Sequence, residues 1–149
     1  MLAGKTIRIA RPTDRLEEVV KFYTDGLGLQ ILDRFENHQG FDGVMVGLPG
    51  SPYHLEFVHQ RGHVVGRAPT LDNLLVFYIP DPQEWQQAID RIKASGYLPV
   101  KSYNPYWDNN GVTFEDPDGY RIVLENTDWD VGESSVKIIQ LTILSRQIG

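Results

Sequence analysis

Two hydrophobic patterns alternate along this chain, one with the period of a strand and one with the period of a helix. Residues 6–11 form a strand-like run. Apolar residues then recur at i, i+3, i+4 and i+7, which predicts a helix with one apolar face, made by Leu16, Val19, Val20 and Tyr23. Asp14 and Glu17 have the spacing of a capping box at its start, and Gly26 and Gly28 end it. Three further strands are predicted, over residues 29–35, 43–48 and 53–59.

The second half of the chain repeats this order of elements. A predicted strand over residues 73–79 precedes a helix that Asp81 caps, with Pro82 at its first position. The apolar face of this helix is predicted to be core and is made by Trp85, Ala88, Ile89 and Ile92. Gly96 ends the helix, and strands are predicted over residues 97–103, 111–115 and 120–125. The Asp-Pro-Asp-Gly sequence at 116–119 is typical of a type I turn.

Equivalent residues in the two halves are separated by a nearly constant distance along the chain. The offset is 67 from Asp14 to Asp81, 68 from Gly43 to Gly111 and 67 from Tyr53 to Tyr120. This period suits two copies of one supersecondary unit better than a solenoid of short repeats. We therefore predict an α+β fold in which two tandem βαβββ modules form a curled mixed sheet around a cleft.

The predicted boundaries place both modules in one domain. The domain covers residues 1–126, with one module at 6–60 and the other at 73–126, and residues 127–149 form a C-terminal extension. Within the extension, residues 136–144 are apolar and rich in β-branched side chains. They are interpreted as an extra edge strand or a subunit contact, or alternatively as a tail.

Composition excludes several classes of protein and site. The chain has 149 residues, of which 41% are hydrophobic and 23% charged, as in an ordinary globular domain. It lacks cysteine, so disulfides and thiolate-based sites are excluded. The net charge is −6 and no basic cluster occurs, which argues against nucleic acid as a partner. No apolar run approaches the roughly 18 residues of a membrane span, and no secretion signal is recognisable, so we expect a cytoplasmic protein.

Three motifs carry a resemblance to a known family. They are the Phe-Tyr to Leu-Gly-Leu segment at 22–29, the His-Leu-Glu-Phe strand at 54–57, and the segment at 114–125 that contains the Asp-Pro-Asp-Gly turn. Together, over about residues 6–126, they resemble the glyoxalase/bleomycin-resistance/extradiol-dioxygenase family, the vicinal oxygen chelate superfamily. The resemblance is specific for the fold, which hosts lyases, epimerases, dioxygenases and antibiotic-binding proteins, and it does not specify an activity. We also expect a homodimer.

The resemblance implies a divalent metal held by residues of the first and last strands of each module. The last strand of the first module keeps a ligand at Glu56, but both the motif and the repeat place Val123 at the equivalent position of the second. The first strands offer Ile7 and Leu74, and shifts of one residue offer no good ligand either: Arg8, Asn73 or Leu75. We therefore predict a metal-free cleft. An alternative is a shifted metal site of His54, Glu56 and Glu125, with the last strand of each module supplying the ligands.

The residues expected to carry chemistry lie on predicted strands and in one loop. Glu56, if it faces the cleft, is the candidate catalytic base; the alternative is an ion pair with a nearby arginine. Arg11 is expected to contact substrate or to be a solvent-facing charge, and Tyr78 to contribute a ring and a hydroxyl or to pack in the core. His54 and Glu125 are further candidate ligand contacts on the last strands.

The loop at 103–110 contains three aromatic residues among polar ones. Trp107 is expected to stack on a planar ligand as part of a wall or lid, or else to pack beneath the loop. His59 and His63 are interpreted as solvated surface histidines.

These observations favour a protein that binds a small organic molecule in a metal-free cleft between the modules. A metal-dependent lyase or isomerase of glyoxalase type, using Glu56, is the alternative, followed by an extradiol-type dioxygenase and a pure interaction module. Neither a phosphate-binding loop nor a nucleophile elbow occurs in the sequence.

Overall fold

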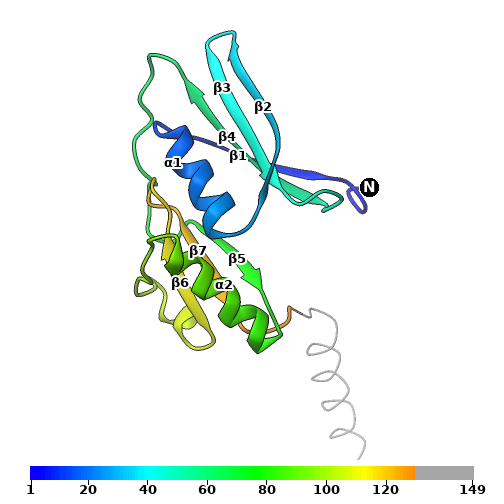
Figure 1. Ribbon diagram of the computed structural model, residues 1–149, viewed down its shortest axis with the longest axis vertical. Coiled ribbons are helices and arrows are strands. Elements are labelled where there is room, and N and C mark those ends of the chain that lie inside the picture. Colours follow the sequence, from blue (N-terminus) through cyan, green and yellow to red (C-terminus); the bar gives the residue numbers. More distant parts are fainter. Residues whose placement is uncertain (130–149) are drawn as a thin grey trace, which may run out of the picture.

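The computed structural model describes residues 1–129, and the rest of the predicted C-terminal extension, including 136–144, lies outside the described residues. The elements of the first half are β1 (Ile7–Pro12), α1 (Leu16–Lys21), the π-helical turn η1 (Phe22–Gly26), β2 (Gln30–His38), β3 (Phe41–Gly47) and β4 (Tyr53–Gln60). Those of the second half are β5 (Leu74–Tyr78), α2 (Pro82–Ala94), the 3-10 turn η2 (Pro105–Asp108), β6 (Gly111–Glu115) and β7 (Arg121–Glu125). Figure 1 shows the two halves as separate sheets, each with its own helix.

Both sheets are mixed, and they are built in the same way. The first has the strand order β1-β4-β3-β2 and the second the order β5-β7-β6. In each, the first strand pairs in parallel with the last strand of its half, and the remaining pairs are antiparallel. The α+β class and the strand–helix–strand order are therefore confirmed, with two unclosed sheets rather than one.

The internal repeat is visible in the register of the strands. Gly43 pairs with Val58 in the first sheet, and Gly111 pairs with Glu125 in the second. Likewise, Met45 pairs with Glu56, whereas Thr113 pairs with Val123. The structure thus places Glu56 and Val123 at equivalent positions of the two sheets, as the spacing predicted.

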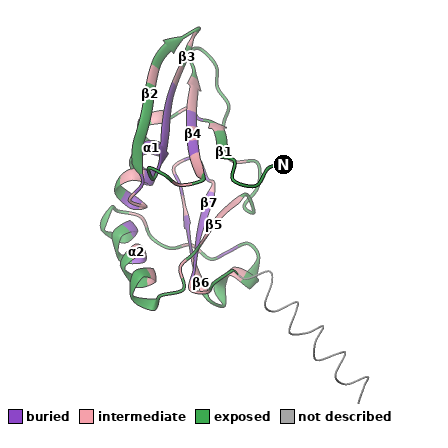
Figure 2. Cartoon of the chain, turned by 90° about the vertical axis from the view of Figure 1, so that its right-hand side faces the viewer, coloured by how far each residue is buried: buried purple, intermediate pink, exposed green. Residues whose placement is uncertain are grey.

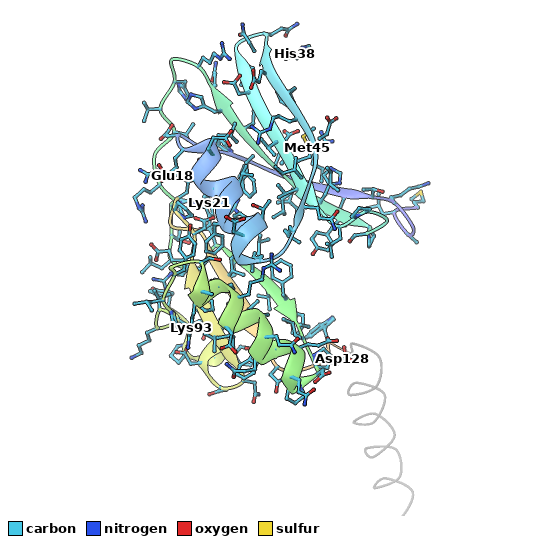
Figure 3. The ribbon with its side chains drawn as sticks, viewed as in Figure 1. Glu18, Lys21, His38, Met45, Lys93 and Asp128 are labelled. Carbon is cyan, nitrogen blue, oxygen red and sulfur yellow. The ribbon has the colours of Figure 1, made fainter. Side chains whose placement is uncertain are left out.

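One continuous apolar core lies between the helices and the sheets. Both predicted helix faces are buried in it, and Figure 2 shows the buried residues along β3, β4, β7 and the inner side of α2. Its fully buried large side chains include Phe22, Tyr23, Phe57, Ile92 and Phe114. Burial of one such side chain contributes about 1.5–3 kcal/mol to folding. Charged residues lie on the exposed outer surfaces of the helices, among them Glu18, Lys21 and Lys93 (Figure 3).

The strand predicted over residues 97–103 is wrong. This segment contributes only an isolated bridge, in which the Val100 N–H donates to the Thr113 carbonyl at 2.8 Å. Pro99 precedes the bridge and has no N–H to donate, and the Lys101 carbonyl accepts from the Arg121 side chain instead of from a strand. The Arg121 side chain thus takes the place of the strand-to-strand hydrogen bonds that the hydrophobic pattern of residues 97–103 favoured.

The predicted cap at Asp14 is also wrong. The helix begins after Arg15, whose side chain forms no capping bond. Asp14 accepts instead from the backbone N–H groups of Val65 and Gly66, at 2.9 and 2.8 Å, and these donors lower the pKa of its carboxyl. Asp14 therefore holds the connection between the two halves.

The predicted cap at Asp81 and the predicted turn at 116–119 are confirmed. Asp81 Oδ1 accepts from the Gln83 N–H at 2.9 Å and caps α2. The Gly119 N–H donates to the Asp116 carbonyl at 3.0 Å and closes the predicted turn.

Within residues 1–129 no helix is long and apolar enough to span a bilayer.

Candidate functional site

The face of the first sheet that points away from α1 carries a polar cluster on β1 and β4, next to Met45 of β3. Leu55 and Phe57 of β4 point into the core, so the alternation of a strand turns His54 and Glu56 to the opposite face. Arg8 is the residue of β1 paired with His54. Its Nε donates to His54 Nε2 at 2.9 Å, and its Nη1 donates to Glu56 Oε2 at 3.1 Å.

Glu56 forms an ion pair with Arg8 in this cluster, which was the alternative to its role as a catalytic base. The Glu56 side chain is 16% exposed and that of Arg8 is 51% exposed. Since His54 Nε2 accepts a hydrogen bond, it carries no proton in this arrangement. Arg8 thus occupies the His54 nitrogen and the Glu56 carboxylate, the two groups that a metal ion would need as ligands. From the sequence, Arg8 was considered only as a poor metal ligand.

The equivalent position of the second sheet offers no donor. Val123 is fully buried there, next to Thr113. The segment that follows α2 crosses this face, where the Ser102 and Thr113 hydroxyls are hydrogen-bonded to each other. The second sheet is therefore covered by its own chain at this position.

A divalent metal does not fit these residues. Glu56 and His54 are bonded to the Arg8 guanidinium, and Val123 cannot ligate. Three or more protein ligands are the usual requirement, and the described residues contain no group of three His, Asp or Glu side chains placed to hold an ion. The shifted site of His54, Glu56 and Glu125 is not assembled.

Glu125 lies on the covered face of the second sheet. It is 4% exposed and is paired with Tyr78 on one side and Gly111 on the other. Its Oε1 is buried without a hydrogen-bond partner among the described residues. Desolvation raises the pKa of this carboxyl above its ordinary value. None of the four described cavities includes Glu125 in its lining.

The aromatic loop divides between solvent and protein. Tyr103 and Tyr106 are exposed, whereas Trp107 is half-buried and meets the Tyr106 ring edge-on at 5.0 Å. The side chain of Asn104 caps η2 by accepting from the Tyr106 N–H at 3.1 Å. The loop therefore presents two tyrosine rings outward and holds the tryptophan nearer the sheet.

Arg11 bridges the two halves instead of facing solvent. Its side chain is 15% exposed. The guanidinium donates to the Tyr23 hydroxyl at 2.6 Å, forms an ion pair with Asp116 at 3.4 Å and lies 4.0 Å from the centroid of the Tyr120 ring. Arg11 also lines a small cavity of about 160 Å³. Both of its hydrogen bonds to protein come from Nη2, and a contact with substrate stays a prediction.

Tyr78 lies in an apolar seam between the halves, which we define by three aromatic residues, Tyr53, Phe77 and Tyr78. They line two adjoining cavities of about 290 and 220 Å³. The other residues of the larger cavity are Ile9, Leu55, Leu75 and Val76. Burial raises the pKa of the Tyr53 hydroxyl.

Sequence reasoning missed Tyr53, although the repeat had matched it with Tyr120. What the repeat cannot indicate is that Tyr53, at the start of β4, lies beside Phe77 of β5, with 6.5 Å between the ring centroids. Trp129 lies against Tyr78, with 5.9 Å between ring centroids. The aromatic character of the seam thus continues to the last described residue.

The interpretation of His59 as a solvated surface histidine is wrong, because His59 lines a polar cavity. His59 is half-buried, with Nδ1 at 3.0 Å from the Thr13 carbonyl. It lines a cavity of about 300 Å³ together with the ion pairs Glu17–Arg34 and Asp42–Arg61. His63 is exposed, as expected. The predicted site residues therefore fall into separate places. His54 and Glu56 lie with Arg8 in what we call the Arg8 cluster, Tyr78 lies in the seam, Arg11 bridges the halves, and Glu125 lies near Trp107.

Two solved structures share the fold of this chain. Glyoxalase I of Leishmania major superposes with a TM-score of 0.65 at 16% identity, over 99% of this chain and all of that one. The fosfomycin resistance protein FosX of Mesorhizobium loti superposes with a TM-score of 0.63 at 13% identity, over 91% of this chain and 99% of that one. These likenesses show the fold of the glyoxalase/bleomycin-resistance class, the vicinal oxygen chelate superfamily.

The particular family follows from closer relatives. The models of the YycE-like N-terminal and C-terminal domains match residues 7–58 and 72–126, so the chain belongs to the YycE-like family. It is 50% identical over 121 residues to the uncharacterized protein YycE of Bacillus subtilis strain 168, covering 81% of this chain and 87% of that one. A YycE protein of unknown function from Bacillus subtilis, known from its crystal structure, superposes with a TM-score of 0.80 at 48% identity, over 87% and 95% of the two chains.

Proposed function

We propose that this protein binds a small organic molecule in the seam between its modules, without a metal ion. The observation that carries the proposal is that Tyr53, from the first module, and Phe77 and Tyr78, from the second, together line two adjoining cavities. Pockets for small ligands are largely apolar, with a few polar groups that orient the ligand, and they gather where structural units meet.

The lining indicates the kind of ligand. Leu55, Leu75 and Val76 provide apolar contacts, and three aromatic rings favour a planar body. The Tyr53 and Tyr78 hydroxyls are the polar groups that would fix its orientation. The net charge of −6 favours a neutral or cationic molecule over an anionic one.

The Arg8 cluster supports the metal-free part of the proposal. A guanidinium already neutralises Glu56 and donates to His54, so a divalent cation would have to displace it and would then find two ligands. The alternative of a metal-dependent lyase has no comparable support from the donor set.

The test fills the seam and leaves the surface next to it unchanged. Ala88 lines the smaller cavity, whereas the neighbouring Gln87 is exposed. We expect a panel of planar aromatic compounds, neutral, cationic and anionic, to contain members that raise the melting temperature of the wild type as RT ln(1 + [L]/Kd) requires. Ala88→Leu should abolish the rise, and the matched control Gln87→Leu should keep it.

Fluorescence provides a second readout at the same place. Trp129 lies against Tyr78, so a bound aromatic compound should change its emission, and Trp129→Phe should remove that signal without removing the thermal shift. If no compound of a broad panel binds, or if the Ala88→Leu and Gln87→Leu variants bind equally, the seam is not the binding site.

Three further expectations stay predictions beside this proposal. Glu56 as a catalytic base, a homodimeric state and a cytoplasmic location each require their own experiment. Catalysis by Glu56 would first need release of the Arg8 guanidinium, since the carboxylate that should take a proton is now its ion-pair partner.

A further inference from the structure

Glu125 is enclosed between the second sheet and the aromatic loop. If Gly111 carried a Cβ, that atom would lie 2.2 Å from Glu125 Oε1 and 2.5 Å from the Trp107 carbonyl oxygen. The carboxyl oxygen and the carbonyl oxygen therefore converge on the same side of Gly111. Both are hydrogen-bond acceptors when the carboxyl is ionised, and Oε1 has no partner among the described residues.

The groups packed around Glu125 do not supply a counter-ion. Its neighbours in the ladder are Tyr78 and Gly111. Further along the same face of β7, Arg121 is held by Glu115 at 3.2 Å and by the Lys101 carbonyl. In the loop, Asp108 accepts from the Ser102 N–H. Within residues 1–129 no ion pair involves Glu125, so an ionised carboxylate there would be both buried and uncompensated.

We propose that Glu125 is uncharged in the folded protein and that its Oε1 hydroxyl donates a hydrogen bond to the Trp107 carbonyl. Glu125 is then a positioning residue, because it holds the loop at 104–109 that carries Trp107. The proton satisfies Oε1 and turns two opposed acceptors into a donor and an acceptor. The raised pKa of this carboxyl, caused by its burial, agrees with that state.

Loss of the proton has a defined consequence for the loop. Ionisation places a negative charge next to the Trp107 carbonyl, and the two oxygens then repel each other. We expect the loop to open more often as the pH rises, while the sheet remains intact. Glu125 also lies beside Tyr78 of the seam, so an effect of pH on ligand binding would follow, and that effect alone rests on the proposed function.

The test measures hydrogen exchange of the backbone amides at 106–110 in the full chain without ligand. Exchange rates are measured between about pH 4 and about pH 9, a range that covers an ordinary and a raised glutamate pKa. Each rate is corrected for the intrinsic exchange rate at that pH. In the wild type, protection of these amides should fall through a one-proton transition. In Glu125→Gln protection should be independent of pH, because the amide NH₂ donates to the Trp107 carbonyl at every pH.

The control and a second measurement make the outcome unambiguous. Glu84→Gln, at an exposed position of α2, should keep the wild-type profile. The carboxyl ¹³C shift of Glu125 in the wild type reports its ionisation directly, even if the variant fails to fold. Wild-type and Glu125→Gln profiles that coincide, or a carboxyl that titrates at its ordinary pKa, would overturn the proposal. Either result leaves the seam experiment untouched, since that experiment depends on Ala88.

Discussion

The hydroxyl of Tyr23 donates a 2.7 Å hydrogen bond to Asp116 Oδ2, and this bond joins the first module to the second. Arg11 reinforces it by donating to Tyr23 and pairing with Asp116. Asp116 Oδ1 accepts from the backbone N–H groups of Asp118 and Tyr120. Burial raises the pKa of the Tyr23 hydroxyl far above its usual value, so the hydroxyl remains a donor. Two of the motifs that carry the family resemblance thus meet in one structural contact.

Removal of the Tyr23 hydroxyl should destabilise the protein. Tyr23→Phe removes the shorter of the two side-chain hydrogen bonds to the buried Asp116 carboxyl, and we expect the free energy of unfolding to fall by about 1–3 kcal/mol. Urea denaturation measures the difference. Tyr103→Phe is the matched control, because Tyr103 is 69% exposed and its hydroxyl should contribute almost nothing. Equal losses in the two variants would show that the contact with Asp116 does not stabilise the fold.

The stability of the protein should depend on pH through Glu125. Burial raises its pKa in the folded state above the unfolded value of 4.5, so between these two values the folded state binds more protons than the unfolded state. Stability is therefore expected to fall as the pH rises from about 4.5 through the folded-state pKa. Glu125→Gln should remove this component and be more stable than the wild type at neutral pH, by about 1.4 kcal/mol for each unit of pKa difference. A wild-type minus variant difference that does not change with pH would contradict this.

The Arg8–Glu56 pair should contribute little to stability. The arginine is half exposed, and ion pairs of this kind are worth about 0.2–1 kcal/mol. Glu56→Gln should therefore lower the free energy of unfolding by less than about 1 kcal/mol.

The same pair makes a prediction about metals. After dialysis against zinc, nickel or manganese salts, elemental analysis should find less than one equivalent of metal in the wild type. Arg8→Ala should bind no better, because it frees only His54 and Glu56. One equivalent of metal that is lost in Glu56→Gln would restore the metal-dependent alternative.

Gly111 should not tolerate a larger residue. A Cβ at this position would lie 2.2 Å from Glu125 Oε1 and 2.5 Å from a backbone oxygen, and such overpacking costs about 1–3 kcal/mol. Gly26→Ala is the control, since no atom lies within 4 Å of its added Cβ. Thermal denaturation should show a lower melting temperature for Gly111→Ala and no such loss for Gly26→Ala. A melting temperature of Gly111→Ala equal to that of the wild type would mean that the loop and carboxyl do not converge there.

The regular elements of the fold could be predicted because their causes are local. The apolar positions Val19 and Val20 face one side of α1 by helical spacing, and Asp81 caps α2 through the N–H two residues later. The local predictions that were wrong failed because a partner far along the chain competes with the local one. Asp14 looks like a cap until the backbone at 65–66, which is far along the chain, offers it two better donors.

The candidate site was less accessible to prediction. The repeat correctly placed Glu56 and Val123 at equivalent positions, and the sequence alone therefore determined that the family's usual ligand set is incomplete. It could not indicate which arginine would meet Glu56. Arg8 and Arg11 lie on the same strand, and the direction of each side chain depends on the pairing of β1 with β4.

The sequence was sufficient to predict most of the strands, both helices, the internal repeat, the turn at 116–119 and the family, because spacing, capping and turn chemistry act over a few residues. Three relationships emerge from the packing of the folded chain: Tyr53 and Tyr78 share a seam, Arg8 pairs with Glu56, and Glu125 lies beneath the Trp107 loop. These relationships join residues from separate strands and loops. They depend on how two sheets and a loop pack together, which no local pattern encodes.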